Sequence, residues 1–335
     1  MTPTTERIAA TVLTGFLGAG KSTLLRRVLT ESHGQKIAVI ENEFGGADID
    51  SEIIVSGGGE QIIQLSNGCV CCTIRDDLRA ALMDLAERRR TGELDFDRVM
   101  IETTGLADPG PVVQTFFLDD EIAARYRPDA ILTLVDAKHA MDQLTDRLEA
   151  RRQVGFADHI FISKTDLVGG ADLAILENRL GRINAKAPRK NVLFGHVALS
   201  EVFDLRGFNL DAELDLPPAC SDTDDHDHVE GRHHNRHDDI KSFVFRSERP
   251  FHPSRFGQFM NALVNSHGPR MLRYKGVLHM WGAERKSIFQ GVHQLMSRED
   301  GLAWKTGEAR ASTLVFIGVD LPEALFLRSL NACLV

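Results

Sequence analysis

The chain has 335 residues and a mass of 37.2 kDa, which fits two domains better than one at about 100 to 200 residues per domain. A content of 43% hydrophobic and 26% charged residues excludes a disordered or fibrous chain. The net charge of −9 argues against nucleic acid or an anionic membrane as a partner, and the lack of a long apolar run or a signal-like start predicts a cytoplasmic protein.

From residue 7 to about residue 205, short apolar runs alternate with longer helix-like stretches, a pattern typical of βα units around a parallel sheet. The expected strands lie at residues 8–13, 37–40, 62–65, 99–101, 131–135, 159–162 and 192–194. The expected helices lie at residues 22–30, 76–90, 142–152 and 172–184. Several runs are apolar without alternation, as strands buried on both faces are, so we predict a doubly wound α/β domain.

A second region begins after an abrupt change in composition. Between residues 216 and 239, Asp, His and Pro displace nearly every core-forming residue, which indicates a linker or a long exposed loop. Beyond it, strands are expected at 242–245, 271–278 and 314–318, and helices at 256–265 and 322–333. Asp320 and Glu323 are spaced as a capping box for the last helix. The predicted parts are a mainly parallel α/β domain (1–205), a linker (206–240) and a smaller α+β domain (241–335).

Residues 15–22 read GFLGAGKS, which fits GxxxxGK[ST] between an apolar strand and a helix and predicts a P-loop. In such a loop the glycines let backbone N–H groups point at phosphates, and the helix N-terminus adds partial positive charge. Lys21 would reach the terminal phosphates as a catalytic residue, and the Ser22 hydroxyl would bind Mg²⁺. The other loop residues expected at the phosphates are Gly15, Gly18, Ala19 and Gly20.

Residues 102–105, at the end of another apolar strand, extend this nucleotide site. They read ETTG, and nucleoside triphosphatases place an acid for Mg²⁺ and a γ-phosphate-sensing glycine at such a position. We therefore assign Glu102 to Mg²⁺ and catalysis and Gly105 to the γ-phosphate. This assignment depends on the P-loop motif, because the tetrapeptide alone is a weak signal.

Residues 163–166 read SKTD and resemble the guanine-reading NKxD of G proteins. The Asp166 carboxylate would accept two hydrogen bonds, from N1–H and the exocyclic amine of guanine, which adenine cannot match. The stem of Lys164 would pack against the base. Ser163 replaces the usual Asn, and we expect the change to weaken a contact that braces this loop. A solvated turn at a strand end is the alternative.

Three of the five cysteines, Cys69, Cys71 and Cys72, stand within four positions, too crowded for an ordinary disulfide framework. A following helix N-terminus and Arg75 would favour their thiolate forms. Three thiolates form a soft donor set suited to Zn²⁺ with a fourth position open, which predicts an exchangeable metal site. A redox-active or merely buried group of thiols is the alternative.

The linker carries a second group of metal-binding side chains, because five of the 13 histidines fall within twelve residues, flanked by aspartates. These histidines are His226, His228, His233, His234 and His237. Imidazole with carboxylate suits Zn²⁺, Ni²⁺ or Co²⁺. The segment either captures metal for the thiolates or is a solvated linker with weak, unselective metal affinity.

Together these motifs resemble the CobW-type members of the metal-handling P-loop GTPases. The matching segments are GFLGAGKST at 15–23, ENEFG at 41–45, GCVCC at 68–72, ETTGLADP at 102–109 and SKTD at 163–166. The later RYKG at 273–276 looks like the C-terminal domain of that family, so the resemblance covers most of the chain. Ser163 is the departure from the family pattern.

The resemblance implies a GTP-dependent metallochaperone, or a metal-cofactor insertase, that delivers Zn²⁺ or sometimes Co²⁺ to a client protein. The residues carried over are Lys21, Ser22 and Thr23 for phosphates and Mg²⁺, Asp166 for guanine, and Cys69, Cys71 and Cys72 for the transferred metal. Glu41 and Glu43 would lie in the segment that responds to the γ-phosphate and are candidates for binding metal or Mg²⁺. A plain charged loop is the alternative for this pair.

The leading hypothesis is a slow GTPase cycle that gates metal transfer. It expects the Glu102 strand and the cysteine loop to be neighbours in the sheet, so that GTP·Mg²⁺ orders both and hydrolysis loosens the metal. Nucleotide and metal would then change each other's affinity by the same factor. The alternative is a metal-responsive storage or regulatory protein with incidental turnover; a small-molecule kinase leaves SKTD and the thiolates unexplained. The sequence does not specify the client, the choice of Zn²⁺ or Co²⁺, or the oligomeric state.

Overall fold

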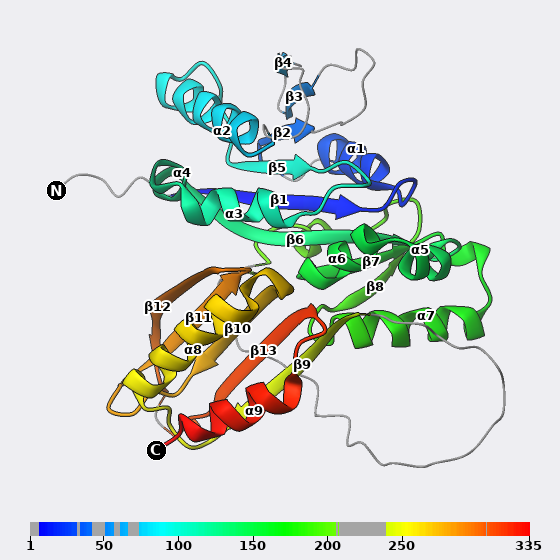
Figure 1. The fold of residues 1–335 in the computed structure, drawn as a ribbon. Coiled ribbons are helices and arrows are strands. Elements are labelled where there is room, and N and C mark those ends of the chain that lie inside the picture. Colours follow the sequence, from blue (N-terminus) through cyan, green and yellow to red (C-terminus); the bar gives the residue numbers. More distant parts are fainter. Residues whose placement is uncertain are drawn as a thin grey trace.

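The computed structural model describes residues 7–31, 34–41, 51–56, 61–65, 74–205, 207, 239–305 and 307–335, with the backbone alone for 51–56, 61–65, 74–75 and 199. Within these ranges the first part of the chain forms an eight-stranded sheet in the order β4-β3-β2-β5-β1-β6-β7-β8 (Figure 1). The strands are β1 (Ile8–Gly15), β2 (Ile37–Glu41), β3 (Ser51–Ser56), β4 (Gln61–Leu65), β5 (Arg98–Glu102), β6 (Tyr126–Asp136), β7 (His159–Ser163) and β8 (Arg189–Val192). Neighbours from β2 to β8 run parallel, whereas β3 pairs antiparallel with both β2 and β4. The predicted doubly wound, mainly parallel sheet is confirmed.

Helices cover both faces of this sheet, because its central strands send apolar side chains into two cores. Along β1, Leu13 packs with Leu24 of α1 on one face, and Val12 packs with Val112 of α3 on the other. Strands buried in this way explain the apolar runs without alternation. The described helices here are α1 (Lys21–Thr30), α2 (Ile74–Thr91), α3 (Gly110–Leu118), α4 (Asp120–Arg125), α5 (Ala140–Asp146), α6 (Leu148–Phe156) and α7 (Gly170–Ile183), with the short 3₁₀ turns η1 (Thr165–Leu167) and η2 (Leu199–Glu201).

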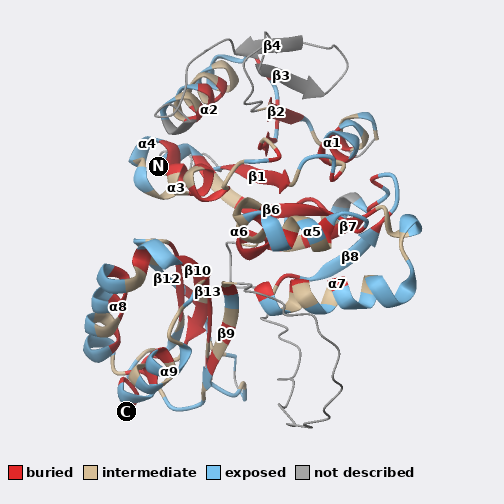
Figure 2. Cartoon of the chain, turned by 45° about the vertical axis from the view of Figure 1, so that its right-hand side comes forward, coloured by how far each residue is buried: buried red, intermediate tan, exposed pale blue. Residues whose placement is uncertain are grey.

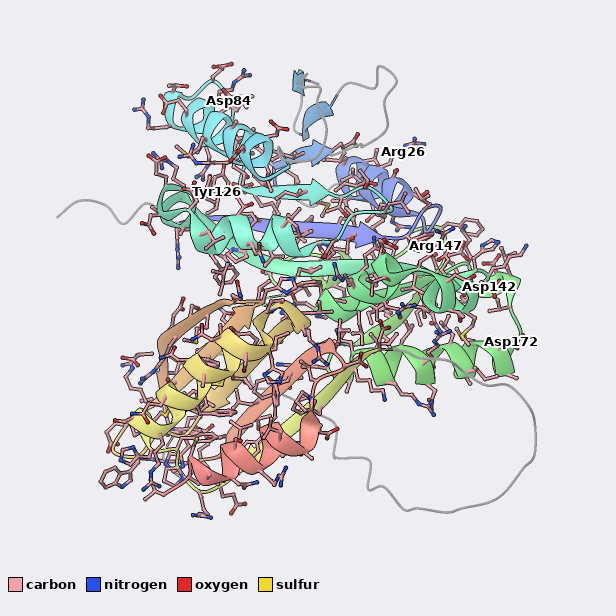
Figure 3. All side chains as sticks on the ribbon, in the orientation of Figure 1. Arg26, Asp84, Tyr126, Asp142, Arg147 and Asp172 are labelled. Atoms are coloured by element: carbon pink, nitrogen blue, oxygen red, sulfur yellow. The ribbon has the colours of Figure 1, made fainter. Side chains whose placement is uncertain are left out.

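The single helix expected at 142–152 is wrong, because the chain forms α5 and α6 instead. The two helices meet at Arg147, labelled in Figure 3, whose backbone is extended with φ −122° and ψ 116°. The Arg151 guanidinium donates hydrogen bonds to the carbonyls of Leu144 and Thr145, at 2.8 and 3.0 Å. It thereby satisfies carbonyls that the end of α5 leaves without helical partners.

The chain forms a second sheet after residue 239, and the described strands run antiparallel in the order β12-β11-β10-β13-β9. The strands are β9 (Ile240–Ser247), β10 (Met271–Leu278), β11 (Arg285–Val292), β12 (Leu295–Ala303) and β13 (Ser312–Val319). Helices α8 (Pro253–His267) and α9 (Glu323–Ala332), with the turn η3 (Gly268–Arg270) between α8 and β10, complete the α+β part. Figure 1 shows α8 and α9 together on one side of this sheet.

The capping box expected for α9 is wrong. Pro322 occupies the N-cap position, and no side chain accepts a hydrogen bond there. Asp320 instead adopts a left-handed backbone with φ 43°, and its N–H donates to the Asp239 carbonyl at 2.7 Å. The aspartate therefore turns the chain out of β13 rather than starting the helix.

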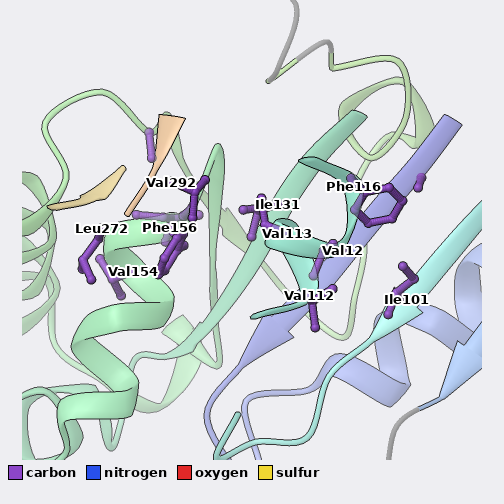
Figure 4. Packing of buried hydrophobic residues seen from close by; sticks show 14 of the residues in the cluster. Val12, Ile101, Val112, Val113, Phe116, Ile131, Val154, Phe156, Leu272 and Val292 are labelled. Atoms are coloured by element: carbon purple, nitrogen blue, oxygen red, sulfur yellow. The ribbon is translucent and has the colours of Figure 1, made fainter. Parts of the chain in front are cut away.

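The two sheets share one hydrophobic core through α6. Val154 and Phe156 of this helix lie in the same cluster as Ile131 of β6 and as Leu272 and Val292 of the second sheet (Figure 4). Figure 2 shows buried residues along the strands of both sheets. Gly155 makes the close approach possible, since a Cβ at this position would already lie 3.1 Å from Leu272. The second sheet is therefore packed on the first part of the chain rather than tethered to it.

A buried ion cluster lies at the same junction. Asp158, between α6 and β7, accepts hydrogen bonds from Arg273 at 2.8 Å and Lys275 at 2.7 Å, both on β10. Its second carboxylate oxygen accepts the Ile131 N–H at 3.0 Å. Burial alone raises the pKa of Asp158, but the charges of Arg273 and Lys275 outweigh burial and hold that pKa well below its ordinary value. Asp158 is thus ionised and shared by two cations of the second sheet.

The alternation of β10 explains the RYKG segment. Arg273 and Lys275 point toward Asp158, whereas the intervening Tyr274 lies in the core of the second sheet and donates to the Leu295 carbonyl at 2.8 Å. Gly276 has no room for a side chain, since a Cβ would lie 2.1 Å from the Thr313 carbonyl oxygen. The motif therefore joins the two sheets through its charged residues and packs its own sheet through the tyrosine.

Candidate nucleotide-binding site

The loop between β1 and α1 has the backbone of a phosphate cradle. Gly15, Gly18 and Gly20 have φ values of 144°, 75° and 99°, a region that side chains strongly disfavour. The buried Lys21 ammonium donates to the carbonyls of Gly15 at 2.8 Å and Phe16 at 3.4 Å. These bonds hold the cation over the loop, where phosphates bind to the backbone N–H groups at the start of α1.

Two oxygen donors lie beside this loop. The Ser22 hydroxyl donates to the Glu102 carboxylate at 3.2 Å, and Glu102 ends β5 at only 9% exposure. Glu41 ends the neighbouring strand β2 in register with Glu102. A hydroxyl and a carboxylate at contact distance form a hard donor set that fits Mg²⁺, which also takes phosphate oxygens as ligands. The structure therefore brings together the two residues predicted for Mg²⁺ and places Glu41 at the same edge of the sheet.

The segment after β5 runs directly over the P-loop. A Cβ at Gly105 would lie 2.7 Å from the Leu17 nitrogen, so only glycine fits between the two backbones. Thr103 secures the start of the segment, because its N–H donates to the Leu13 carbonyl at 2.9 Å and its hydroxyl to Thr14 at 2.9 Å. Gly105 thus occupies the place expected of a residue that senses the γ-phosphate.

The base loop after β7 is braced against the P-loop by the residue predicted to weaken it. The Ser163 hydroxyl donates to the Ala19 carbonyl at 2.7 Å and contacts the Val135 carbonyl at 3.3 Å. The serine thus makes a buried hydrogen bond of its own across 144 residues of sequence, and the weakening relative to Asn stays a prediction. Asp166 lies in η1 with its side chain exposed, as a base-reading carboxylate requires.

Asp136 is a site residue that sequence reasoning missed. It ends β6, is buried, and accepts hydrogen bonds from Lys164 at 2.7 Å and from the Lys138 N–H at 2.9 Å. His139 Nδ1 lies 2.9 Å from the same carboxylate. Burial raises the pKa of Asp136, but these partners outweigh burial and hold its pKa below the ordinary value. Lys164, anchored by Asp136, has a left-handed backbone at φ 57° and stands two residues before Asp166. An acidic residue at the end of a buried strand was the signal for this role.

Phe194 is a second residue that was missed, because a strand was expected at 192–194. The strand β8 ends at Val192, in register with Ser163, and the chain turns through Phe194 and Gly195. A Cβ at Gly195 would lie 3.3 Å from the Leu24 backbone of α1, so this turn rests on the helix that begins with the P-loop lysine. Phe194 is 77% exposed and lies two residues after Val192, which pairs with Ser163.

The predicted cargo-metal residues lie outside the described residues. They are Cys69, Cys71, Cys72, Glu43, His226, His228, His233, His234 and His237. The described residues contain no group of three or more His, Cys, Asp or Glu side chains placed to hold a metal. The cysteine segment connects β4, which ends at Leu65, to α2, which begins at Ile74.

The expected neighbourhood of the cysteine loop and the Glu102 strand stays a prediction, because the loop lies outside the described residues; the strand before it, β4, is not paired with β5. Strands β3 and β2 separate β4 from β5, because an unpredicted strand, β3, inserts a hairpin at this edge. Two antiparallel pairings make β4 parallel to β2, so Leu65 ends at the same edge of the sheet as Glu41 and Glu102. The β4 end is on the nucleotide side of the sheet, two strands away from Glu102.

Comparison with known proteins places this site in a family. Residues 9–190 match the CobW/HypB/UreG nucleotide-binding domain, and residues 240–334 match the C-terminal domain of the cobalamin synthesis protein CobW. This chain belongs to the CobW/HypB/UreG family. Membership confirms the resemblance drawn from the motifs and the predicted enzyme class, a P-loop GTPase.

Two curated relatives span nearly the whole CobW-type chain. The zinc chaperone YjiA of Escherichia coli is 42% identical over 94% of this chain and 95% of its own. The zinc chaperone CobW of a Sinorhizobium species is 31% identical over 97% of both chains. A crystal structure of the Zn(II)-bound YjiA GTPase from E. coli has a TM-score of 0.77 at 39% identity, covering 98% of this chain and 99% of that one. In the described part of this chain, no helix is long and apolar enough to cross a membrane.

Proposed function

We propose that this protein is a GTP-dependent metallochaperone that binds Zn²⁺ at Cys69, Cys71 and Cys72 and delivers it to a client protein. The observation that carries the nucleotide half is the braced site at one sheet edge, with Lys21 over the P-loop and Ser22 beside Glu102. The similarity to two named zinc chaperones across nearly the whole chain supports the metal half. The proposal takes residues 1–205 as the GTPase domain, 206–240 as the linker and 241–335 as the C-terminal domain.

The chemistry assigned to the nucleotide site follows from its residues. Mg²⁺ held by Ser22 and Glu102 would neutralise phosphate charge, and Lys21 would stabilise the charge that develops on the terminal phosphates. Gly105 would offer its N–H to the γ-phosphate, and Asp166 would select guanine. Glu41, at the end of β2, would link the γ-phosphate side of the site to the segment that follows this strand.

The assignment of the cargo rests on donor chemistry and on the topology of the sheet. Thiolates are soft ligands that suit Zn²⁺ and also bind Co²⁺, so Co²⁺ is the alternative cargo. The cysteine segment begins and ends at Leu65 and Ile74, and Leu65 lies at the sheet edge that carries Glu41 and Glu102. Coupling between nucleotide and cargo would therefore pass through β2 and β3 rather than by direct strand contact. We place this cycle in the cytoplasm, where thiols stay reduced.

We propose that the exposed Phe194 ring stacks on the guanine base, and this role gives a direct test of the base site. Stacking of an aromatic ring on a nucleobase contributes about 1 to 3 kcal/mol, so Phe194→Ala is expected to weaken GDP binding roughly tenfold. Phe194→Trp should retain the affinity, and Trp281→Ala, which removes another exposed aromatic ring, should have no effect. The measurement is a titration with fluorescent GDP, with ADP as competitor.

The same titration tests the guanine assignment. Wild type should prefer GDP to ADP strongly, because Asp166 reads the guanine edge, and Phe194→Ala should weaken both nucleotides alike, because a ring face reads no edge. Equal affinity of wild type for GDP and ADP would contradict the proposed GTPase. Unchanged GDP binding by Phe194→Ala would contradict the stacking of Phe194 on the base but not the proposed GTPase.

A further inference from the structure

The segment 105–110 lies over the P-loop after β5. Two consecutive residues of α6 bind it through side-chain hydrogen bonds. Gln153 Nε2 donates to the carbonyls of Gly105 at 3.1 Å and Ala107 at 3.0 Å, and Gln153 is 1% exposed. The Gln153 backbone carbonyl accepts the Thr133 hydroxyl of β6 at 2.9 Å. One buried amide therefore fixes the backbone of the proposed γ-phosphate sensor to a helix that is itself tied to the central sheet.

Arg152 holds the far end of the same segment. Its guanidinium donates to Asp108 at 2.6 Å, and the other Asp108 oxygen accepts the Gly110 N–H at 2.9 Å where α3 begins. Gln153 and Arg152 thus anchor both ends of the segment on one turn of α6. Contact with the nucleotide accounts for Gly105, but it assigns no role to Gln153 or Arg152.

The C-terminal end of α6 contacts the second sheet. Arg273 donates to the Phe156 carbonyl at 2.7 Å, and a Cβ at Gly155 would lie 3.1 to 3.5 Å from Leu272, Ile240 and Ile317. Helix α6 therefore contacts both the γ-phosphate segment and three strands of the C-terminal domain.

His293, in the turn between β11 and β12, contacts both α6 and the end of the segment 105–110. Its ring lies edge-on to Phe156 with centroids 5.8 Å apart, and its Nε2 lies 3.1 Å from where a Gly110 Cβ would stand. The backbone of His293 is left-handed at φ 53°, so the ring projects from a tight turn. The C-terminal domain therefore reaches the start of α3 as well as α6.

We propose that Gln153 is a positioning residue for the γ-phosphate response, and that the C-terminal domain, through His293 and α6, helps to set the geometry of Gly105. The inference rests on the proposed GTPase function and deepens it. GDP has no γ-phosphate, so the amide of Gln153 matters for the triphosphate state and for turnover, not for the diphosphate. Because coupling is reciprocal, a triphosphate that moves Gly105 would also alter the contact of α6 with the second sheet.

The test compares full-length variants by their affinities for GDP and for a nonhydrolysable GTP analogue, and by GTP turnover. Gln153→Met removes the amide but keeps the volume, and loss of a buried hydrogen bond is expected to lower kcat and the analogue-to-GDP affinity ratio about tenfold. His293→Asn keeps a residue suited to the left-handed turn and should lower both quantities by a few-fold. GDP affinity should stay within about twofold of wild type in both. The controls are Gln258→Met, exposed on α8, and His279→Asn, just past the end of β10, and they should leave all three values unchanged.

Equal loss of GDP and analogue affinity in Gln153→Met would show a merely structural role and overturn the proposal. An unchanged ratio would do the same. A response of His293→Asn no larger than that of His279→Asn would overturn the part played by the C-terminal domain. The ratio of analogue to GDP affinity is measured without turnover. If the wild type does not hydrolyse GTP, the proposed function is contradicted, whereas the role of Gln153 is still tested by the ratio.

Discussion

Asp158→Asn is expected to lower the free energy of unfolding by about 3 to 5 kcal/mol, the usual cost of removing one partner from a buried ion pair. Asparagine keeps the shape of the side chain but leaves Arg273 and Lys275 buried without their shared anion. Arg273 is 4% exposed and Asp158 is 2% exposed at the side chain, so water offers little compensation. Denaturation in urea measures the change.

The control is Asp84→Asn, which breaks an ion pair on the surface of α2. Asp84, labelled in Figure 3, lies 2.9 Å from Arg88 one helical turn away, with 40% of its side chain exposed. Such pairs contribute about 0.3 to 0.5 kcal/mol. Removing Lys275 together with Asp158 should cost less than the sum of the two single changes, because each single change already breaks the same Asp158–Lys275 ion pair. A cost for Asp158→Asn as small as that for Asp84→Asn would contradict the ion cluster.

The same cluster predicts that the free energy of unfolding rises with pH in two separate ranges. Burial lowers the pKa of Lys275 to about 8 from 10.5, although Asp158 raises it. Between these two values the unfolded chain keeps a proton that the folded protein has released, so the free energy of unfolding should rise with pH. Asp158 acts in the acid range, where its depressed pKa makes stability fall as pH drops below about 4. His159 and Lys186 also face the cluster and have pKa values lowered by burial, so wild type must be compared with Lys275→Met.

Lys21→Met is expected to lower GTP hydrolysis about a hundred- to a thousandfold, the usual effect of removing one donor from developing charge. The buried ammonium is already held over the P-loop by the carbonyls of Gly15 and Phe16, so no rearrangement is needed when phosphate binds. Methionine fills the same space without a charge. Release of phosphate from GTP at saturating concentration measures the loss.

Lys190→Met serves as the control for this change. Lys190 pairs with Glu201 on the surface, with 48% of its side chain exposed, and takes no part in the nucleotide site. Turnover should stay at the wild-type level in this variant. Wild-type turnover in Lys21→Met would contradict the role assigned to the P-loop lysine.

The sequence specifies the central strands and the phosphate loop well, because both depend on local patterns. A run such as 37–40 is apolar on both faces, and GFLGAGKS requires glycines whose backbone no other residue adopts. The strands β3, β11 and β12 were missed. Arg285 and Lys286 begin β11, and charged residues interrupt β12, in which six of nine residues are exposed. The break at Arg147 depends on Arg151, four residues later, and no periodicity reveals it.

The part of the site that escaped prediction depends on contacts between distant residues. Ser163 contacts the P-loop through Ala19, and Asp136 contacts Lys164, so each contact appears only after β6 and β7 are paired. Gln153 stands in a helix with no motif, and only its two hydrogen bonds to the segment after β5 reveal its place. Local motifs therefore predicted the residues that would bind nucleotide, but not the residues that hold them in position.

The most direct measurement is a competition titration of Zn²⁺, first with GDP and then with Mg²⁺ and a nonhydrolysable GTP analogue. It uses wild type, a variant with Cys69, Cys71 and Cys72 replaced by Ser, and a variant without residues 224–239. The account predicts that the nucleotide state changes Zn²⁺ affinity in wild type and in the deletion, with tighter binding in the analogue, and that the cysteine variant loses this difference. Equal Zn²⁺ affinity with both nucleotides, or binding that ignores the cysteines, would contradict nucleotide-gated metal transfer and favour a storage or regulatory protein.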